Sequence, residues 1–246
     1  PLLHGRRRLD PRTVHAAVHH MNIELRSVSK SYLSMERRHT VFRDLSLEFP
    51  KGLNVGVIGP NGSGKSTLLR LMAGADTPDS GRVIRHARMS WPVGFAGAFS
   101  GKLSGVANAR FCARAYNRDP NEVVAFTRDF SGLNDFMDWP LSACSTGMRA
   151  RYAFALSMAI DFECLLIDEI LGVGDVEFRA KCAEALEARR ATSDVILVSH
   201  NLKDIIRLCD RVIILGGHKP IVSDDVVKSV KQYSIAVGGS VDAMEL

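Results

Sequence analysis

The polar and apolar positions of this chain alternate as in β-strands over several short segments from Met21 onward. Residues 22–28 alternate between the two kinds of side chain, and Leu45, Leu47 and Phe49 repeat the pattern. Further apolar segments have the length of strands that are buried on both faces. They occupy residues 53–58, 163–168, 194–199 and 211–215.

Helical patterns lie between several of these segments. A helix is expected around residues 65–72, and a stripe of apolar side chains predicts a helix of about 16 residues further along. The stripe consists of Phe178, Cys182, Ala185 and Leu186. Buried strands that alternate with helices form a mostly parallel sheet covered by helices. The pattern therefore predicts an α/β fold.

Residues 101–160 interrupt this alternation because they contain no clear strand pattern. A helix is expected to begin after Asp119, whose side chain can cap it, with Pro120 in the first turn and Glu122 placed to cap reciprocally. A second helix is expected over about residues 146–160. We interpret the stretch as a helical subdomain inserted into the α/β core.

The first twenty residues differ from the rest of the chain, which we assign to a single domain over residues 21–246. They begin with proline, whereas Met21 opens the first strand pattern. They also carry a basic cluster of Arg6, Arg7, Arg8 and Arg12. We expect residues 1–20 to be a basic extension that is disordered or lies upstream of the natural start. The alternative is a basic arm that binds anionic lipid or a partner.

The composition is that of a globular protein, with 46% hydrophobic and 24% charged residues, which excludes a mainly disordered chain. No apolar run approaches the roughly 18 residues that cross a bilayer. Much of the net charge of +5 comes from the first twenty residues, so charge gives no general argument for nucleic-acid binding. The 5 cysteines form no CxxC pair, which favours reduced cytosolic thiols over a disulfide framework or a zinc site.

A complete phosphate-binding motif, GxxxxGK[ST], follows the predicted strand 53–58 and opens the next helix. It consists of Gly59, Pro60, Asn61, Gly62, Ser63, Gly64, Lys65 and Ser66, and we include Thr67 with it. The glycines let the backbone form a nest of N–H donors, and the positive end of the helix faces the phosphates. Lys65 is expected to reach the terminal phosphates, and the Ser66 hydroxyl to bind magnesium. The motif therefore predicts a site for ATP and Mg²⁺.

Two acidic residues, Asp168 and Glu169, stand at the end of the predicted strand 163–168. Asp168 is placed to hold magnesium, and Glu169 to polarise an attacking water molecule. An acidic pair at a strand end is more often a helix cap when it occurs alone. The phosphate loop earlier in the chain favours the catalytic interpretation.

Between these two motifs, a segment resembles the signature motif of ABC transporter ATPase subunits, usually written LSGGQ. It consists of Cys144, Ser145, Thr146, Gly147 and Met148, and it opens a predicted helix. The Ser–x–Gly core is retained, whereas the usual leucine, first glycine and glutamine are replaced. An ordinary serine N-cap would explain Ser145 alone, but not its position between two ATPase motifs.

Further residues match the ABC family in the family's order. Tyr32 corresponds to the aromatic residue that stacks on adenine, and Asp175 to the loop that reports across the ATPase dimer. His200 corresponds to the switch histidine that contacts the γ-phosphate. The resemblance thus implies that Lys65, Glu169 and His200 are the catalytic residues.

One position departs from the family pattern. The glutamine that joins magnesium and water to the membrane partner should fall within residues 91–105, which contain none. Alignment of the flanking residues puts Ser100 in its place. A serine hydroxyl reaches less far than a glutamine amide, so Ser100 is kept as a candidate magnesium ligand that acts through water.

Three stretches narrow the resemblance to the ATPase subunits that export capsular polysaccharide, with O-antigen and teichoic-acid exporters as relatives. They read SWPVGFAGAFSGKLSG, CSTGMRARYAFAL and VGDVEFRAKC. The resemblance implies a P-loop NTPase core of the ABC type, with a parallel sheet, an antiparallel β part and an inserted helical subdomain. It also implies an ATP sandwich between two copies of the chain and a partnership with an integral membrane permease subunit. The complex would lie at the cytoplasmic face of the bacterial inner membrane.

Two alternatives belong to other functional classes. A soluble ABC ATPase acting on ribosomes or DNA usually joins two cassettes or contains long coiled coils, whereas this chain has one cassette and no sustained heptads. A P-loop kinase or small-molecule transferase would not explain the signature segment or the switch histidine. Both alternatives are weaker than transport, and no nucleic-acid partner is expected.

Overall fold

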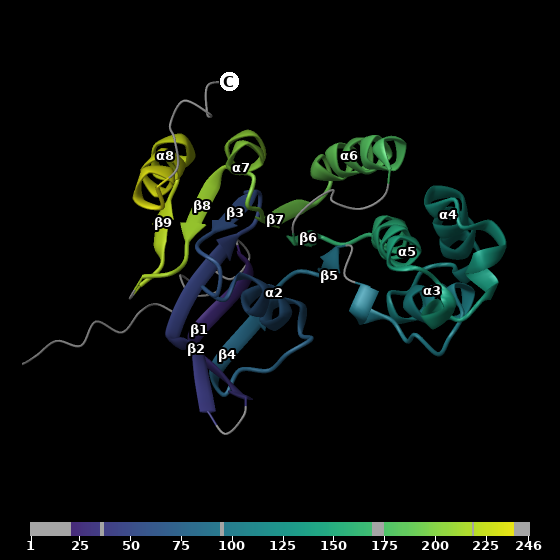
Figure 1. The fold of residues 1–246 in the computed structure, drawn as a ribbon, viewed down its shortest axis with the longest axis horizontal. Coiled ribbons are helices and arrows are strands. Elements are labelled where there is room, and N and C mark those ends of the chain that lie inside the picture. Colours follow the sequence, from purple (N-terminus) through teal and green to yellow (C-terminus); the bar gives the residue numbers. More distant parts are fainter. Residues whose placement is uncertain (1–20, 35–36, 94–95, 169–174, 218, 239–246) are drawn as a thin grey trace, which may run out of the picture.

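The chain is described by a computed structural model. The described residues are 21–34, 37–93, 96–168, 175–217 and 219–238. Their strands form one sheet of three strands and one of six, with helices packed around them (Figure 1). The predictions for residues 1–20 and for Glu169 lie outside the described residues.

The smaller sheet is antiparallel, with its strands in the order β2-β1-β4. The strands are β1 (Met21–Ser34), β2 (Arg37–Pro50) and β4 (Ser80–Arg85). Alternate apolar side chains of β1 and β2 are buried, with Ile23 opposite Phe49 and Leu25 opposite Leu47. The strand predicted over residues 22–28 is confirmed, and pairing with β2 makes it longer than its apolar pattern.

The larger sheet has the order β5-β6-β7-β3-β8-β9 and is parallel except between β8 and β9. The strands are β3 (Val55–Ile58), β5 (Met89–Val93), β6 (Cys164–Asp168), β7 (Asp194–Val198), β8 (Arg211–Ile214) and β9 (Ile221–Ser223). The four strands predicted from apolar runs are the four central ones. The prediction of an α/β fold with a mostly parallel sheet is therefore confirmed, and β5 and β9 add strands at its two edges.

Helices connect most of these strands, and short 3₁₀ helices lie between some of them. The α-helices are α2 (Lys65–Ala73), α3 (Gly105–Ala115), α4 (Pro120–Ser131), α5 (Thr146–Ala159), α6 (Val176–Arg190), α7 (Leu202–Leu208) and α8 (Val226–Ala236). The 3₁₀ helices span Ala96–Ala98, Asn134–Asp138 and Leu141–Ala143. Within the described residues, no helix has both the length and the apolar character needed to span a bilayer.

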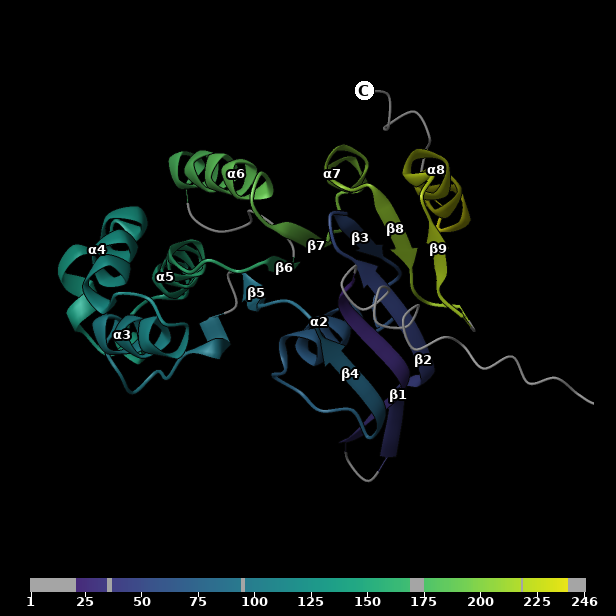
Figure 2. The same cartoon turned by 180° about the vertical axis from the view of Figure 1, so that it is seen from behind.

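The stretch of residues 101–160 consists of α3, α4, α5 and two 3₁₀ helices, with an isolated bridge between Ser104 and Pro140. The predicted start of α4 is confirmed, because the Asp119 side chain accepts hydrogen bonds from the first-turn N–H groups of Asn121 and Glu122. Figure 2 shows α3, α4 and α5 gathered at one end of the molecule, away from the antiparallel sheet.

Two clusters of buried apolar side chains lie on opposite faces of the six-stranded sheet. In β6, Leu165 and Ile167 belong to the cluster shared with α3 to α8, whereas Leu166 belongs to the one shared with α2 and the antiparallel sheet. Both views show α6, α7 and α8 along one face and α2 with the small sheet on the other. The position of α2 is therefore fixed by packing against both sheets.

Candidate functional site

A cavity of about 380 Å³ lies where β3, β6 and β7 end. These three strands are parallel neighbours, so their carboxyl ends meet at one edge of the sheet, where open α/β sheets bind their ligands. The cavity is lined by Tyr32, His39, Val41, Asn61, Gly62, Gly64, Lys65, Ser66, Thr67, Arg70, Asp168 and His200. Most of the residues predicted to bind the nucleotide are thus gathered at one place.

The N-terminus of α2 opens onto this cavity through Gly64, Lys65 and Ser66, and no side chain caps it. In the described part of the chain, the other α-helices begin with a capping side chain, namely Ser104, Asp119, Ser145, Asp175, Asn201 and Asp225. Gly64 has φ +95°, and a Cβ there would come within 2.6 Å of Val41 and Phe42, so glycine is required. The uncapped N–H groups suit a bound anion.

Lys65 brings a buried positive charge to the same end of α2. Its side chain is folded back over the loop, and the ammonium group donates to the carbonyl oxygens of Gly59 at 2.8 Å and Pro60 at 3.0 Å. Only 8% of Lys65 is exposed. A buried ammonium beside an uncapped helix N-terminus is well placed to bind phosphate oxygens, because both carry positive charge in a poorly solvated setting.

Asp168 and His200 reach the cavity from neighbouring strands. Asp168 ends β6 and is paired with Val198, the last residue of β7, and His200 lies two residues after Val198. Asp168 is half-buried and His200 is exposed. This register explains why two residues far apart in sequence line one cavity. Glu169, the predicted base, follows Asp168 directly but lies outside the described residues.

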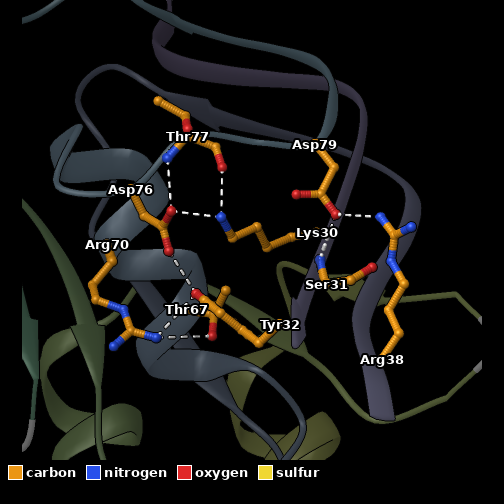
Figure 3. A network of polar contacts seen from close by, with 9 residues as sticks. All are labelled: Lys30, Ser31, Tyr32, Arg38, Thr67, Arg70, Asp76, Thr77 and Asp79. Atoms are coloured by element: carbon orange, nitrogen blue, oxygen red, sulfur yellow. Dashed lines mark hydrogen bonds and ion pairs between the residues drawn. The ribbon is translucent and has the colours of Figure 1, made fainter. Parts of the chain in front are cut away.

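Tyr32 lines the cavity from β1, and its hydroxyl group is held from two directions (Figure 3). It donates to Asp76 Oδ2 at 2.6 Å and accepts from the Arg70 guanidinium at 3.1 Å. The Lys30 ammonium lies 5.0 Å from the centre of the ring. Burial alone would raise the pKa of Asp76, but hydrogen bonds from Lys30, Tyr32 and the Thr77 backbone outweigh it and hold this pKa below its ordinary value.

Three of the lining residues were not predicted from the sequence, namely His39, Val41 and Arg70. Arg70 lies three residues after Thr67 and four after Ser66, so helical spacing places it on the same face of α2 and could have predicted it. His39 lies directly opposite Tyr32 in the ladder between β1 and β2, which puts the two side chains on one face of the sheet. That contact depends on strand register, which sequence spacing did not supply.

Four of the residues predicted to bind ATP or magnesium in the same chain are not among the described residues that line the cavity. Gly59 and Pro60 contribute through the carbonyl oxygens that hold Lys65, and the Ser63 hydroxyl is buried. Ser100 is exposed, and its backbone is bonded twice to the Asn108 amide at 3.0 Å. Ser100 is thus not among the described residues that line the cavity with Asp168, and its contact with the metal stays a prediction.

The signature segment also lies outside this cavity. Ser145 is the N-cap of α5, and its hydroxyl oxygen accepts a hydrogen bond from the Met148 N–H at 3.2 Å. Thr146 and Gly147 follow it and are exposed. The segment therefore presents a helix N-terminus at the surface, apart from the phosphate loop of its own chain (Figure 1).

Asp175 is connected to the signature helix by one arginine. Its carboxylate caps α6 by accepting from the Phe178 N–H at 2.9 Å, and it lies 3.5 Å from the guanidinium of Arg151 on α5. Arg151 also lies over the Phe178 ring at 4.5 Å and donates to the Ser131 carbonyl oxygen at the end of α4. Arg151 therefore connects α5 with the end of α4 and with the start of α6.

The side chains around the cavity fit a nucleoside triphosphate with a magnesium ion. The uncapped end of α2 and the Lys65 ammonium are donors for phosphate oxygens, and the Tyr32 ring offers a face for a base. Ser66 and Asp168 line the same cavity and supply the hard oxygen atoms that Mg²⁺ prefers.

Comparison with known proteins agrees with this geometry. The polysialic acid transport ATP-binding protein KpsT of Escherichia coli is 47% identical over 79% of this chain and 90% of that protein. The capsule polysaccharide export ATP-binding protein CtrD of Neisseria meningitidis serogroup B is 42% identical over 86% of this chain and 98% of that protein. Proteins for O-antigen and teichoic-acid export are similar at lower identity.

The fold has solved counterparts. A dimeric ATP-binding cassette in a post-hydrolysis state, bound to ADP and Pi, superimposes with a TM-score of 0.66 at 20% identity, covering 82% of this chain and 97% of that one. At that identity the likeness concerns the fold alone. The family described as ABC transporter matches residues 42–172. Together with the identities above, this match shows that the chain belongs to the ABC transporter family and is one of its ATP-binding proteins.

Proposed function

We propose that this chain is the ATP-hydrolysing subunit of an ABC transporter that exports a polysaccharide of the capsular type. The observation that carries the proposal is the cavity at the end of α2, which is lined by an uncapped helix N-terminus, by Lys65 and by Asp168. The high identity to two proteins named for capsule and polysialic acid transport supports the class of cargo.

Each residue has a distinct part in the proposed hydrolysis. Lys65 and the N–H groups that open α2 bind phosphate oxygens, while Ser66 and Asp168 hold Mg²⁺. Bound Mg²⁺ neutralises charge that develops on the phosphates. Glu169 accepts a proton from the attacking water, and His200 contacts the γ-phosphate.

We further propose that the active form is a dimer with ATP between two copies. The signature residues Ser145 and Gly147 then face the phosphate loop of the second copy. Their exposure, and their distance from the cavity of their own chain, support this arrangement. We assign to Asp175 the role of reporting the state of one site to the other, and its ion pair with Arg151 of the signature helix supports this assignment.

The proposed partner is an integral membrane permease subunit, which would hold this chain at the cytoplasmic face of the bacterial inner membrane. The names of the similar proteins support this proposal, because transport and export require a path through the membrane. An ATPase for O-antigen or teichoic-acid export remains the alternative cargo assignment, and a soluble ABC ATPase is the alternative in another class.

Co-purification tests the proposal. The chain is co-expressed with the candidate permease, the membranes are dissolved in detergent, and a tag on the permease is used for capture. The chain should elute with the permease, and the complex should hydrolyse ATP. A chain that never elutes with a permease would contradict the transport assignment.

Complementation in a capsulated strain that lacks its own export ATPase then tests the cargo. The parent chain, expressed with its permease, should restore surface capsule, and its Lys65→Ala variant should not. Restoration of O-antigen alone in a matched strain would overturn the capsular assignment while keeping the transport function.

A further inference from the structure

A partly buried polar network connects Tyr32 to the segment that follows α2 (Figure 3). The Asp76 carboxylate is at its centre, accepting from the Tyr32 hydroxyl at 2.6 Å through Oδ2 and from the Lys30 ammonium at 2.6 Å through Oδ1. The Lys30 ammonium also donates to the Thr77 carbonyl oxygen at 2.7 Å. The side chains of Lys30 and Asp76 are only 10% and 20% exposed, so little water competes for these bonds.

Resting on the proposed function, we infer that Asp76 is a positioning residue for the nucleotide base, acting by fixing the Tyr32 ring at the cavity. Asp76 belongs to neither the phosphate loop nor the strand that ends at Asp168, so the sequence motifs do not include it. Asp76 does not line the cavity, so it acts through Tyr32.

The charges around Tyr32 explain why a carboxylate is needed at this position. Lys30 lies 5.0 Å from the centre of the Tyr32 ring and the Arg70 guanidinium 5.6 Å from it. Asp76 pairs with Lys30 and binds the hydroxyl that Arg70 also contacts. Without Asp76, two cations would remain beside the ring, and the hydroxyl group would lose its acceptor. The hydroxyl group would then be held by Arg70 alone, so the ring would be less firmly fixed in the position in which a base can stack on it.

The network also fixes the position of the Tyr32 ring, where the base would stack, relative to the phosphate-binding end of α2. The first turn of α2 carries Lys65 at the phosphate end, whereas Arg70 in its last turn and Asp76 just beyond it hold Tyr32. One rigid helix therefore connects the phosphate cradle with the base platform. The affinity for a ligand without a base should not change when Asp76 is replaced. This difference between ligands distinguishes a loss of ring positioning from general damage to the fold.

The test compares two ligands on the full chain, ATP and inorganic tripolyphosphate, each with Mg²⁺, by equilibrium titration. Asp76→Ala should weaken ATP binding by about three- to tenfold, part of what base stacking is worth, and leave tripolyphosphate binding unchanged. Asp76→Asn, which keeps an acceptor for the Tyr32 hydroxyl, should restore most of the loss. Equal weakening of both ligands, or unchanged ATP binding, would overturn the inference.

Two further variants serve as an independent test and as a control. Tyr32→Phe keeps the ring and removes only the hydroxyl, so it should weaken ATP selectively, and combining it with Asp76→Ala should add little. If Asp76→Ala does not fold, Tyr32→Phe alone tests the inference. Unchanged ATP binding in Tyr32→Phe would contradict the role of the hydroxyl contacts in fixing the ring. Asp79→Ala is the matched control, because Asp79 binds the Ser31 N–H and Arg38 instead of Tyr32.

The same titrations separate this inference from the proposed function. A parent chain that binds ATP no better than tripolyphosphate would overturn the role of Tyr32 and Asp76 and leave the phosphate site intact. A parent chain that binds neither ligand would overturn the nucleotide site itself.

Discussion

The ammonium group of Lys65 lies 2.8 Å from the carbonyl oxygen of Gly59, so the charged residue near the end of the phosphate loop is hydrogen-bonded to the first residue of the loop. Gly59 has φ +155°, and a Cβ there would come within 2.6 Å of the Leu215 carbonyl oxygen. The loop therefore owes its shape to a glycine at one end and a buried cation at the other. Binding of phosphate competes with the two carbonyl oxygens for this ammonium.

Replacement of Lys65 should abolish most of the affinity for nucleotide. Lys65→Ala removes the buried cation and should weaken ATP binding by about 10- to 100-fold, the range for a hydrogen bond to a charged group. Equilibrium titration with a non-hydrolysable ATP analogue measures this. Lys51→Ala, in an exposed turn, is the control and should leave the affinity unchanged. Equal affinity of parent and Lys65→Ala would mean that phosphate binds elsewhere.

Arg189 lies outside the nucleotide cavity, and its replacement should lower the free energy of unfolding substantially. Its guanidinium donates to the carbonyl oxygens of Met158 and Ile160 at the end of α5, at 2.7 and 2.9 Å, and to Asp161 at 2.8 Å. Arg189→Met should lower the free energy of unfolding by about 2 kcal/mol in urea titrations. The exposed Arg179 on the same helix offers a matched control, for which about 0.5 kcal/mol or less is expected. Equal effects of the two variants would refute the role in holding α5.

The five cysteines should be unreactive in the folded chain, because all of them are buried. Burial raises the pKa of Cys112 to about 11 and those of Cys182 and Cys209 to about 12, and it also raises the pKa of Cys164. At pH 8 a thiol reagent should label the native chain slowly and the denatured chain at every cysteine. Fast labelling of the native chain at that pH would contradict the burial of the cysteine side chains.

The same pKa shifts predict lower stability in alkali. Unfolded thiols ionise near pH 8.5, roughly their ordinary pKa, whereas the folded thiols of Cys112, Cys182 and Cys209 stay protonated up to about pH 11 to 12. The folded state therefore binds more protons in this window, and its stability is full below about pH 8.5 and falls as the pH rises through it. The urea concentration at the midpoint of unfolding should be lower at pH 9.5 than at pH 7.5. A higher midpoint at pH 9.5 would contradict the predicted sign.

Restoring glutamine at Ser100 should be tolerated by the fold. The Ser100 side chain is exposed, and Asn108 holds this position through its backbone alone, so stability should change by no more than about 0.5 kcal/mol. If Ser100 stands in the place of the family glutamine, Ser100→Gln should shift the magnesium dependence of ATPase activity in the complex with the permease. Superimposable magnesium titrations would defeat the claim that this position contacts the metal.

Local patterns predicted the features that depend on neighbouring residues. The phosphate loop lies between a buried strand and a helix start, and the stretch 163–168 has a continuous apolar run between its two acidic end residues, so both could be located from sequence. The edge strand β5 contains Pro92, which removes a backbone donor and weakens a strand pattern. His39 and Asp76 were missed because their contacts with Tyr32 arise from strand register and from packing across the fold.

The most direct measurement of the central claim compares the ATPase rate of the parent chain with that of Glu169→Gln, each with its permease. If Glu169 is the general base, turnover should fall by roughly 10²- to 10⁴-fold while ATP binding persists. The neutral side chain should also favour an ATP-bound dimer, since it removes negative charge near the γ-phosphate. Gel filtration with ATP and magnesium would then show a dimer of the variant. A Glu169→Gln variant that hydrolyses ATP at the parental rate would contradict the catalytic assignment.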